Sequence, residues 1–301
     1  MLSYLGRWDA VAGVTLFPFW AWGIAGGVLS TVAWRLHRGR LPVFLLLAWA
    51  FATLLFSEDL SGLVRKRIPL AANAPRAASE LRVITLNCAG QVAAAQEVWA
   101  WKPDVVLLQE SPASNDLARL AKEWFGPDGN FIFGWDCSIV ARGQLTAPPG
   151  PKPVRFVHGT LRLGRGPEVE VVSLRLEPPE TGLAFWSASC WRDHLRNRQR
   201  RREQLQQVLA QLDPAHPAAP RIVGGDFNAP AGDAVFRLLK GTVKECFREA
   251  GVGWGNTALN SFPVSRPDQI WINPASHPVG VWARRTRHSD HRMVICDVVL
   301  R

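Results

Sequence analysis

The stretch RIVGGDFNAP, residues 221–230, gives the clearest indication of the fold. Its apolar and small residues up to Gly225 predict a buried strand that ends on Asp226, with Asn228 two residues further on. Polar side chains at strand ends lie on loops at the edge of a sheet, where binding and catalytic groups are usually found. The stretch therefore predicts a sheet with polar residues at one edge.

The same arrangement recurs along residues 81–301. Polar residues adjoin four more apolar runs: Asn87 after 82–86, Glu110 after 104–108, Asp268 before 269–272, and Asp290 with His291 before 293–300. Any one of these could be an ordinary turn residue or a solvated strand end. Seven such residues beside buried strands, Asp226 and Asn228 included, predict one shared site at the rim of the domain.

The composition of this set favours phosphate chemistry. Oxygen ligands without a thiolate favour Mg²⁺ or Mn²⁺ over zinc, and the five scattered cysteines contain no CxxC pair. A metal held by one or two carboxylates keeps positions open for a phosphate oxygen and water. A histidine beside carboxylates can act as a base or stabilise charge, and an asparagine amide can donate to a phosphoryl oxygen. The set therefore predicts metal-assisted attack on a phosphoester.

Short apolar runs and amphipathic helices alternate through the same region. Further strands are predicted at 131–134, 137–141, 154–163, 169–176 and 279–283, and helices at 91–101, 114–125, 190–212 and 231–239. No helix separates the runs between 131 and 176, which predicts antiparallel hairpins. The mixture favours an α/β fold with two packed sheets and outer helices over a doubly wound sheet.

Five motifs resemble, in order, those of the endonuclease/exonuclease/phosphatase superfamily, which has the DNase I-like fold: TLNCAG (85–90), PDVVLLQE (103–110), GGDFNAP (224–230), RPDQIW (266–271) and HSDHRMV (288–294). The resemblance covers residues 80–301. It implies a four-layer α/β sandwich, two packed mixed β-sheets flanked by helices, and a Mg²⁺-dependent phosphoric ester hydrolase. Family substrates include DNA, RNA, phosphoinositides and sphingomyelin, and the motifs do not distinguish among them.

The resemblance also implies the ligands of the metal. Glu110 matches the main ligand of Mg²⁺ or Mn²⁺, assisted by Asn87 and Asp290.

Four other positions match the family's catalytic residues. Asp226 resembles the carboxylate that orients or deprotonates the attacking water, and Asn228 the amide that holds the phosphoryl group. Asp268 resembles the partner of the motif histidine, here His291.

The sequence departs from the family pattern at Arg175, in VVSLRL (171–176), where the family usually has a histidine or tyrosine. An arginine there still counts as catalytic, because it can stabilise negative charge on a phosphate, but its pKa above about 12 keeps it from acting readily as a general acid. His194 or His158 could compensate from elsewhere in the fold, which the sequence does not specify. The change leaves a rival interpretation open, a membrane-tethered pseudoenzyme that binds a phosphate ligand without turnover. The otherwise intact motif set argues for the enzyme.

Residues 1–67 have the composition of a membrane anchor. Residues 10–33 carry no charge, and a second apolar run covers 41–56. About 20 apolar residues cross a bilayer, so transmembrane helices are predicted at about 10–34 and 41–57. A cleaved signal peptide would not precede a second apolar run, and buried core helices would show a polar face. Residues 68–79, rich in Ala and Pro, are typical of a linker, and 80–301 form the expected catalytic domain.

The charge distribution suggests partners and orientation. Lys and Arg number 35 against 25 Asp and Glu, a formal net charge of +10, which suits a phosphate-bearing partner or an anionic membrane. Arg35, Arg38 and Arg40 favour a cytoplasmic connector between the apolar runs by the positive-inside rule, whereas the basic residues 65–67 after the second run favour the reverse. We therefore expect a multi-pass protein of the cell membrane with an extracytoplasmic catalytic domain.

The expected partners are a phosphate-containing substrate, either nucleic acid or a phospholipid headgroup, and the lipid bilayer; no obligate protein partner is inferred. Arginines cluster at 192–202 and at 284–292. The first cluster could be a solvated helix face or a surface that attracts substrate or membrane. The second flanks the HSDH motif, which favours attraction of a phosphate-bearing substrate or a membrane surface.

Overall fold

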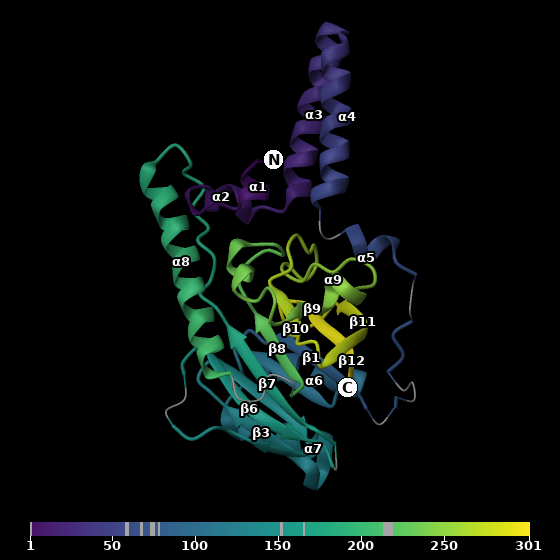
Figure 1. Ribbon diagram of the computed structural model, residues 1–301, viewed down its shortest axis with the longest axis vertical. Helices are drawn as coiled ribbons and strands as arrows, with labels where there is room; N and C mark the ends of the chain where they lie inside the picture. The colour runs from purple at the N-terminus through teal and green to yellow at the C-terminus, as the bar shows by residue number, and fades with distance from the viewer. Residues whose placement is uncertain are drawn as a thin grey trace.

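Two mixed β-sheets of six strands each form the centre of the molecule (Figure 1). The computed structural model describes residues 2–57, 60–66, 69–72, 76–77, 79–150, 153–164, 166–212 and 219–301. The first sheet has the order β11-β12-β1-β2-β4-β3, and its strands are β1 (Glu80–Asn87), β2 (Val105–Gln109), β3 (Gly129–Phe133), β4 (Cys137–Arg142), β11 (Ser276–Arg284) and β12 (Met293–Leu300). The second has the order β5-β6-β7-β8-β10-β9, and its strands are β5 (Gln144–Thr146), β6 (Phe156–Arg162), β7 (Glu168–Arg175), β8 (Arg221–Asp226), β9 (Lys244–Glu245) and β10 (Asp268–Ile272).

Alternation along the strands divides the core into three layers of side chains. Val83 and Leu107 of the first sheet meet Val171, Ile222 and Ile270 of the second between the two sheets. Their sequence neighbours point the other way, because successive side chains of a strand lie on opposite faces. Those outward-facing residues need a cover of helices, and this requirement produces the four-layer arrangement.

Helices cover both outer faces. Ile84 and Val106 pack under α6 (Val92–Glu97), η3 (Val98–Trp101) and α7 (Ser114–Phe125). The outer face of the second sheet packs against α8 (Ala188–Gln211). The shorter helices are η4 (Gly126–Asp128), η5 (Ala234–Leu238) and α9 (Cys246–Ala250). The predicted architecture of two packed mixed sheets flanked by helices is confirmed.

Strand pairing brings the predicted polar residues to one edge. β1 and β2 are parallel and end side by side at Asn87 and Gln109, and β7 and β8 are parallel with Arg175 opposite Asp226. β10 runs antiparallel to β8 and places Asp268 opposite Asp226. Gly225 permits the close pairing of β8 with β7. A Cβ at this residue, which has φ +147°, would lie 1.9 Å from the carbonyl oxygen of Leu174.

The N-terminal region forms a helical hairpin that projects from the domain (Figure 1). Short α1 (Leu2–Gly6), η1 (Asp9–Val11) and α2 (Ala12–Leu16) precede the long α3 (Phe19–His37) and α4 (Arg40–Phe56). Gly23 of α3 faces Thr53 of α4, and Gly26 faces Trp49. Small residues of this kind let two helices approach closely.

The predicted continuous helix 10–34 is wrong. The chain bends by 72° between Asp9–Leu16 and Phe19–His37. Pro18 is the cause, because it lacks an N–H and disfavours helical geometry in the residue before it; Phe17 is extended at φ −78°, ψ 142°. Within the described ranges, no single helix has both the length and the apolarity to cross a membrane, and only this bent pair reaches the requirement jointly. The second predicted helix, 41–57, agrees with α4, a shorter apolar helix.

The segment after the hairpin lies partly within the described residues. Residues 68, 73–75 and 78 of the predicted linker, and Arg67 before it, fall outside them. The short α5 (Ser61–Val64) lies against α9, and Arg65 donates to the carbonyl oxygens of Phe247 (2.9 Å) and Gly251 (3.1 Å). These bonds connect the hairpin to the sandwich.

Arginines of α8 form a second connection. Arg198 is buried and pairs with Asp233 at 3.0 Å, and it also donates to the Thr15 hydroxyl. Arg202 donates to both carboxylate oxygens of Asp9, at 2.7 and 3.1 Å. The arginine cluster at 192–202 is therefore divided: these members are used in internal contacts, whereas Arg192 and Arg196 are exposed.

Candidate active site

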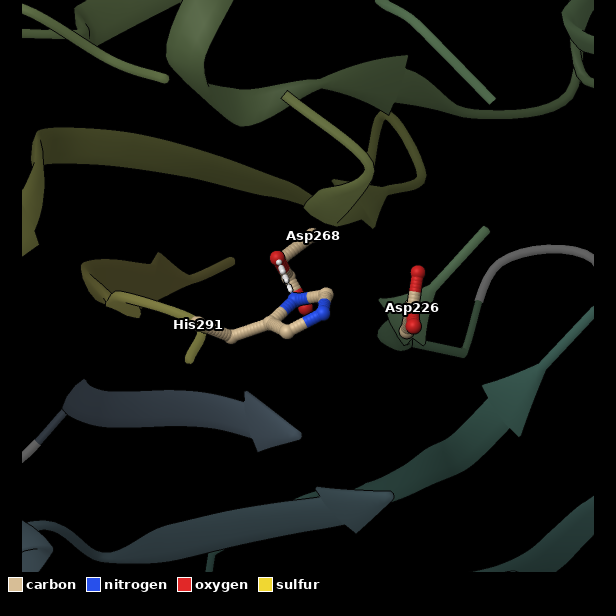
Figure 2. Close-up of side chains that lie close together, drawn as sticks. All are labelled: Asp226, Asp268 and His291. Atoms are coloured by element: carbon tan, nitrogen blue, oxygen red, sulfur yellow. Dashed lines mark hydrogen bonds and ion pairs between the residues drawn. The ribbon is translucent and has the colours of Figure 1, made fainter. Parts of the chain in front are cut away.

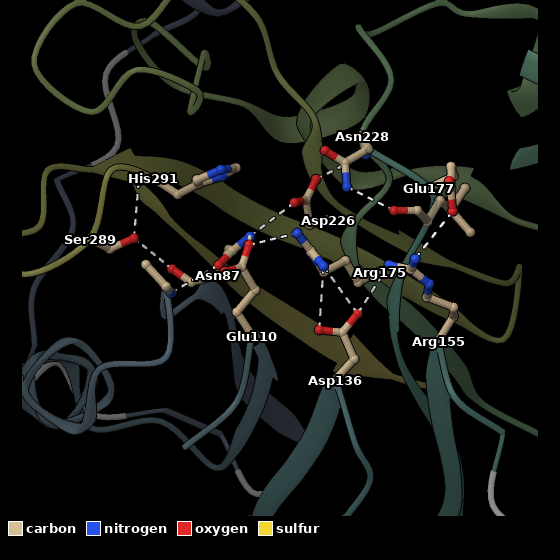
Figure 3. Close-up of polar contacts among 12 residues, drawn as sticks. Asn87, Glu110, Asp136, Arg155, Arg175, Glu177, Asp226, Asn228, Ser289 and His291 are labelled. Atoms are coloured by element: carbon tan, nitrogen blue, oxygen red, sulfur yellow. Dashed lines mark hydrogen bonds and ion pairs between the residues drawn. The ribbon is translucent and has the colours of Figure 1, made fainter. Parts of the chain in front are cut away.

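The ends of β1, β2 and β8 bring three predicted site residues into contact (Figure 3). The amide of Asn87 donates to Glu110 Oε1 at 3.0 Å and to Asp226 Oδ2 at 3.1 Å. Asn87 and Asp226 are buried, while Glu110 is about one-third exposed. The amide thus joins carboxylates of the two sheets at the edge where the strands end.

Asp226, Asp268 and His291 form a compact group beside them (Figure 2). One ligand atom from each lies within 4.8 Å of the others. His291 Nδ1 lies 2.8 Å from Asp268 Oδ2, which also accepts a hydrogen bond of 2.5 Å from the Thr257 hydroxyl. Asp268 Oδ1 is buried and has no hydrogen-bond partner among the residues described.

Burial and charge shift the pKa values of this group in useful directions. Burial, reinforced by the charge of Asp268, raises the pKa of Asp226 to about 6. Burial alone would lower the pKa of His291, but the charge of Asp268 and its hydrogen bond outweigh this and raise it to about 10. At neutral pH the site therefore holds a carboxylate close to its pKa beside an imidazolium.

This shift predicts a pH dependence of stability in the metal-free protein. The folded pKa of His291 exceeds its ordinary value of 6.5, so the stabilisation is complete below pH 6.5 and is lost as pH rises towards 10. Urea unfolding in EDTA should show the free energy of unfolding falling across this window. His291→Gln should flatten the profile, and parallel profiles for the two proteins would contradict the pairing with Asp268.

Arg175 lies at the same edge and connects two carboxylates (Figure 3). Its Nη2 lies 2.7 Å from Glu110 Oε1, and its Nη1 lies 3.2 Å from Asp136 Oδ2. Arg155 contacts Asp136 at 3.4 Å and Glu177 at 3.2 Å. Burial would lower the pKa of Arg175, but the charges of Asp136 and Glu110 raise it. The guanidinium is thus a permanent cation against the carboxylate that the motifs assign to the metal.

Two of the site residues have unusual backbone conformations. Glu110 has φ +43° and Asn228 has φ +48°, in the left-handed region that residues other than glycine seldom adopt. The Asp226 carboxylate accepts from the Asn228 N–H at 2.9 Å, and the Asn228 amide donates to the Leu176 carbonyl at 2.8 Å. Such conformations concentrate at functional sites, where surrounding contacts hold them in place.

Among the described residues, three other predicted side chains make no hydrogen bond to this cluster, although the charge of Asp290 acts on the neighbouring His291. Asp290 is exposed and lines a surface pocket with Phe262, Arg285 and Arg287. His194 contacts the Gly182 carbonyl at 2.8 Å, and His158 lies 3.0 Å from Glu170. In the described part of the chain, neither histidine contacts the cluster, so neither has the position needed to compensate for Arg175.

Sequence reasoning missed several members of the site. Asp136 lies in the short turn between β3 and β4, Thr257 in the long loop before β10, and Ser289 within the HSDH motif itself. The Ser289 hydroxyl donates to the Asn87 carbonyl at 2.6 Å and accepts from the His291 N–H at 3.0 Å. Its place in the motif was the only available signal, because the contacts of Asp136 and Thr257 depend on how the sheets pack.

The donor set fits a hard divalent cation. The site offers carboxylate oxygens of Glu110, Asp226 and Asp268, and oxygen ligands suit Mg²⁺ and Mn²⁺. The unpartnered buried oxygen of Asp268 and the raised pKa of Asp226 both mark negative charge that a cation would stabilise. Among the described residues, His291 and Arg175 already supply positive charge beside these carboxylates.

The sandwich of two mixed sheets, with an acidic cluster and a histidine at its strand ends, defines the class of DNase I-like α/β folds. The model of the Endonuclease/Exonuclease/phosphatase family matches residues 84–291, and the chain belongs to this family. Its members are phosphoric ester hydrolases, and the family generally depends on a divalent metal. A comparison with curated proteins found no match.

Solved structures share the fold. An endonuclease/exonuclease/phosphatase from Beutenbergia cavernae is 19% identical, with a TM-score of 0.55 over 74% of this chain and 72% of that one. The mannosyl-6-phosphatase Bt3783 of Bacteroides thetaiotaomicron is 17% identical, with a TM-score of 0.55 over 73% and 100%. D. rerio TDP2, complexed with a single-strand DNA product, is 19% identical, with a TM-score of 0.51 over 73% and 99%. At these identities the likeness shows the fold alone.

Proposed function

We propose that the protein is a metal-dependent phosphoesterase that hydrolyses a phosphodiester or phosphomonoester by attack of an activated water molecule. The observation that carries this proposal is the convergence of Asp226, Asp268 and His291 within 4.8 Å, beside Asn87 and Glu110 of the other sheet. Family membership supports the reaction class. The DNA product and the mannosyl phosphate named for two fold neighbours support a phosphate-containing substrate.

In this mechanism Asp226 takes a proton from the attacking water. A pKa of about 6 leaves it ionised at neutral pH and still basic enough for the transfer. The water oxygen bonds to phosphorus, the ester P–O bond breaks, and the leaving oxygen takes a proton from solvent. Asp268 keeps His291 protonated, so that the imidazolium stabilises the phosphoryl oxygens.

Arg175 and Asn228 add positive charge and an amide donor at the same edge. A guanidinium offers two fixed donors to phosphoryl oxygens, which become more negative in the transition state. Glu110 and Asn87, with Asp290, are the proposed ligands of Mg²⁺ or Mn²⁺, which when bound would supply Lewis-acid stabilisation of the phosphoryl group.

The first test of this function is metal removal. Activity against a panel of plasmid DNA, RNA, phospholipids and a chromogenic bis-ester should require Mg²⁺ or Mn²⁺ and disappear in excess EDTA. Glu110→Gln should lower kcat by about 100-fold or more, since it removes the charge of the proposed main ligand. Full activity of that variant in EDTA would contradict the metal proposal.

The contact between Arg175 and Glu110 supports a second candidate function. In this alternative the protein is a pseudoenzyme that binds a phosphate ligand without turnover. An arginine paired with the proposed metal ligand could replace the metal as the positive group of the site. The same panel decides between them: the pseudoenzyme binds phosphoesters with or without EDTA and releases no product in either condition.

The hairpin of α3 and α4 is the proposed membrane anchor. At 1.5 Å per residue, the 19 residues of α3 extend about 28 Å, close to the roughly 30 Å of a hydrocarbon core. Large apolar side chains along both helices are exposed, among them Leu29 and Leu36 of α3 and Phe44 and Leu54 of α4. Exposed apolar surface of this size suits lipid rather than water. We propose a multi-pass protein of the cell membrane on this basis.

The arginines of the connector predict the orientation. With Arg35, Arg38 and Arg40 in the cytoplasm, a reporter fused after Arg301 should lie outside it. Alkaline phosphatase fused there should be active, and a fluorescent protein that folds only in the cytoplasm should be dark. The opposite pair of results would reverse the orientation.

A further inference from the structure

Exposed apolar side chains gather around the foot of the α3–α4 hairpin. Leu2 and Leu5 of α1 and Trp8 beside it are each more than half exposed. Leu183 is 58% and Trp186 90% exposed in the loop before α8. These five side chains are called the foot surface below. Large aromatic and aliphatic groups at such exposure mark a surface that meets a partner.

The two parts of the foot surface belong to one layer. Phe185, the neighbour of Trp186, packs against Phe17 with ring centroids 6.4 Å apart, and it also lies against Gly13 of α2. Figure 1 shows the first turn of α8 beside α2, at the level where the hairpin leaves the domain. The chain bends by 72° between Asp9–Leu16 and α3. The layer that contains α2 therefore lies across the long axis of the hairpin.

Basic side chains accompany the foot surface. Leu5 shares a surface pocket with Arg7, Arg237 and Lys240. Arg192 and Arg196, in the first turns of α8, are exposed close to Trp186 in sequence. Leucine and tryptophan interleaved with arginine and lysine are typical of segments that lie in the interface of a membrane with anionic lipids.

Internal bonds fix this layer relative to the catalytic domain. Arg202 binds Asp9 through both carboxylate oxygens, and the buried Arg198 donates to Thr15. Arg237 donates to the Gly6 carbonyl at 2.7 Å. Arg201, on the same face of α8, donates to the carbonyl of Asn228 in the site. The foot of the hairpin and the catalytic edge are therefore held by one helix.

The catalytic edge is connected by a short stretch of chain to residues beside the start of the hairpin. Pro230 and Ala231 line a small gap together with Pro18 and Phe19, where α3 begins. Asn228 is two residues from Pro230, at most about 7 Å of extended chain. The headgroup layer on each side of a bilayer is roughly 5–8 Å deep. If α3 enters the hydrocarbon at its first turn, the catalytic edge lies on the headgroup side of the same leaflet.

We propose that the foot surface sits in the membrane interface and holds the site against the leaflet, so that the substrate is a phosphoester carried on a lipid headgroup in the bilayer. This inference rests on the proposed function, whose reaction it leaves unchanged: water adds to phosphorus, the ester P–O bond breaks, and the lipid or its headgroup leaves. The inference adds that the ester is part of a lipid in the bilayer. A water-soluble ester of the same chemistry reaches the site without help from the foot surface.

The position of the foot surface can be measured without any activity. The full chain is placed in nanodiscs of phosphatidylcholine and phosphatidylglycerol, with a nitroxide on Trp186→Cys or on Glu168→Cys. All five native cysteines are buried, and Glu168 begins β7, at the end of that strand opposite Arg175. A nickel-chelating lipid should strongly increase the spin relaxation rate of the nitroxide at position 186. It should change the relaxation rate of the nitroxide at position 168 only a little. Equal relaxation at the two positions would overturn the placement.

The substrate is tested with matched esters. Phosphatidic acid and the nitrophenyl ester of phosphatidic acid are each offered as long-chain lipids in the same bilayers and as soluble dibutanoyl analogues. Initial rates for the long-chain form should exceed those for the soluble form by at least tenfold at equal bulk concentration. Leu183→Ser with Trp186→Ser should lower only the long-chain rate, by about tenfold. Val279→Ser, an exposed apolar residue of β11, is the matched control and should change neither rate.

The outcomes separate this inference from the function on which it rests. If lipid and soluble esters are hydrolysed at equal rates, and the double variant changes neither rate, the proposal of a lipid substrate is overturned. The proposed phosphoesterase activity is not affected by that result. The proposal of a lipid substrate is also overturned if neither ester is hydrolysed in Mg²⁺ or Mn²⁺ while nucleic acids are cleaved. If no ester of the full panel is hydrolysed while the label at 186 still reports the interface, the proposed function fails and the membrane placement stands.

Discussion

Asp226→Asn is expected to lower kcat/KM by about 10²–10⁴-fold for every phosphoester that the protein hydrolyses. The variant keeps the size of the side chain and its hydrogen bond from the Asn228 N–H, but it removes the proton acceptor. It also removes the negative charge that helps to keep the pKa of His291 high. Steady-state rates in saturating Mg²⁺, over pH 5–9, measure the effect.

The pH profile gives this prediction a second readout. In the wild type, kcat/KM should rise as Asp226 ionises, so the acidic limb reports the ionisation that the base requires. Asp226→Asn should lose this limb as well as the rate. Asp116→Asn makes the same chemical change at the exposed pair with Arg119, 2.9 Å apart, and should leave rate and profile intact. A rate for Asp226→Asn within twofold of wild type would remove Asp226 from the mechanism.

Strand ends explain how much of the site could be predicted from the sequence. A buried strand shows itself by its apolar run, and the residue that follows the run must lie at an edge of the sheet. This reasoning led to Asn87, Glu110 and Asp226, which are in contact in the structure. The pairing of Asp226 with Asp268 follows from the register of β8 and β10, which a single sequence does not specify.

Contacts that depend on tertiary packing could not be predicted. Asp136 looks like an ordinary turn residue, and only the packing of the two sheets brings it to Arg175. Arg198 and Arg202 looked like part of a solvated or substrate-binding cluster, yet they bind residues of the N-terminal segment almost 200 positions away. By contrast, Pro18 can be seen in the sequence, but a proline within an uncharged run does not by itself show that the helix breaks there.

The same limit applies to the membrane assignment. Apolar length indicates a segment that must avoid water, but it does not distinguish a lipid environment from a protein one. The exposure of side chains such as Leu36 and Leu54 adds the information that the sandwich does not cover the hairpin. Arg198, Arg202 and Arg65 fix the position of the hairpin relative to the domain, which the apolar runs alone do not predict.

Arg175 is the residue whose replacement should separate catalysis from metal binding. Its guanidinium contacts Glu110 at 2.7 Å, where it can stabilise a phosphoryl group and where, under the proposed function, it would compete with a divalent cation for the carboxylate. Asp136 shares this guanidinium at 3.2 Å and draws part of its charge away from Glu110. The two contacts therefore have opposite consequences for a metal.

Arg175→Met should lower the rate by about 10–1000-fold, the loss expected for one charge-stabilising donor, and at the same time tighten Mn²⁺ binding by about tenfold. Asp136→Asn should weaken Mn²⁺ binding. Without the charge of Asp136, Arg175 pairs more strongly with Glu110, and this carboxylate is then less available to the metal. Titration calorimetry with Mn²⁺ and single-turnover rates measure the two quantities independently. Asp116→Asn again provides the control for an exposed carboxylate. Unchanged rates and unchanged Mn²⁺ affinity in Arg175→Met would place this guanidinium outside both functions. Opposite shifts in Mn²⁺ affinity for Arg175→Met and Asp136→Asn would show that the charges around Glu110 control metal binding, since a general loss of stability would weaken binding in both variants.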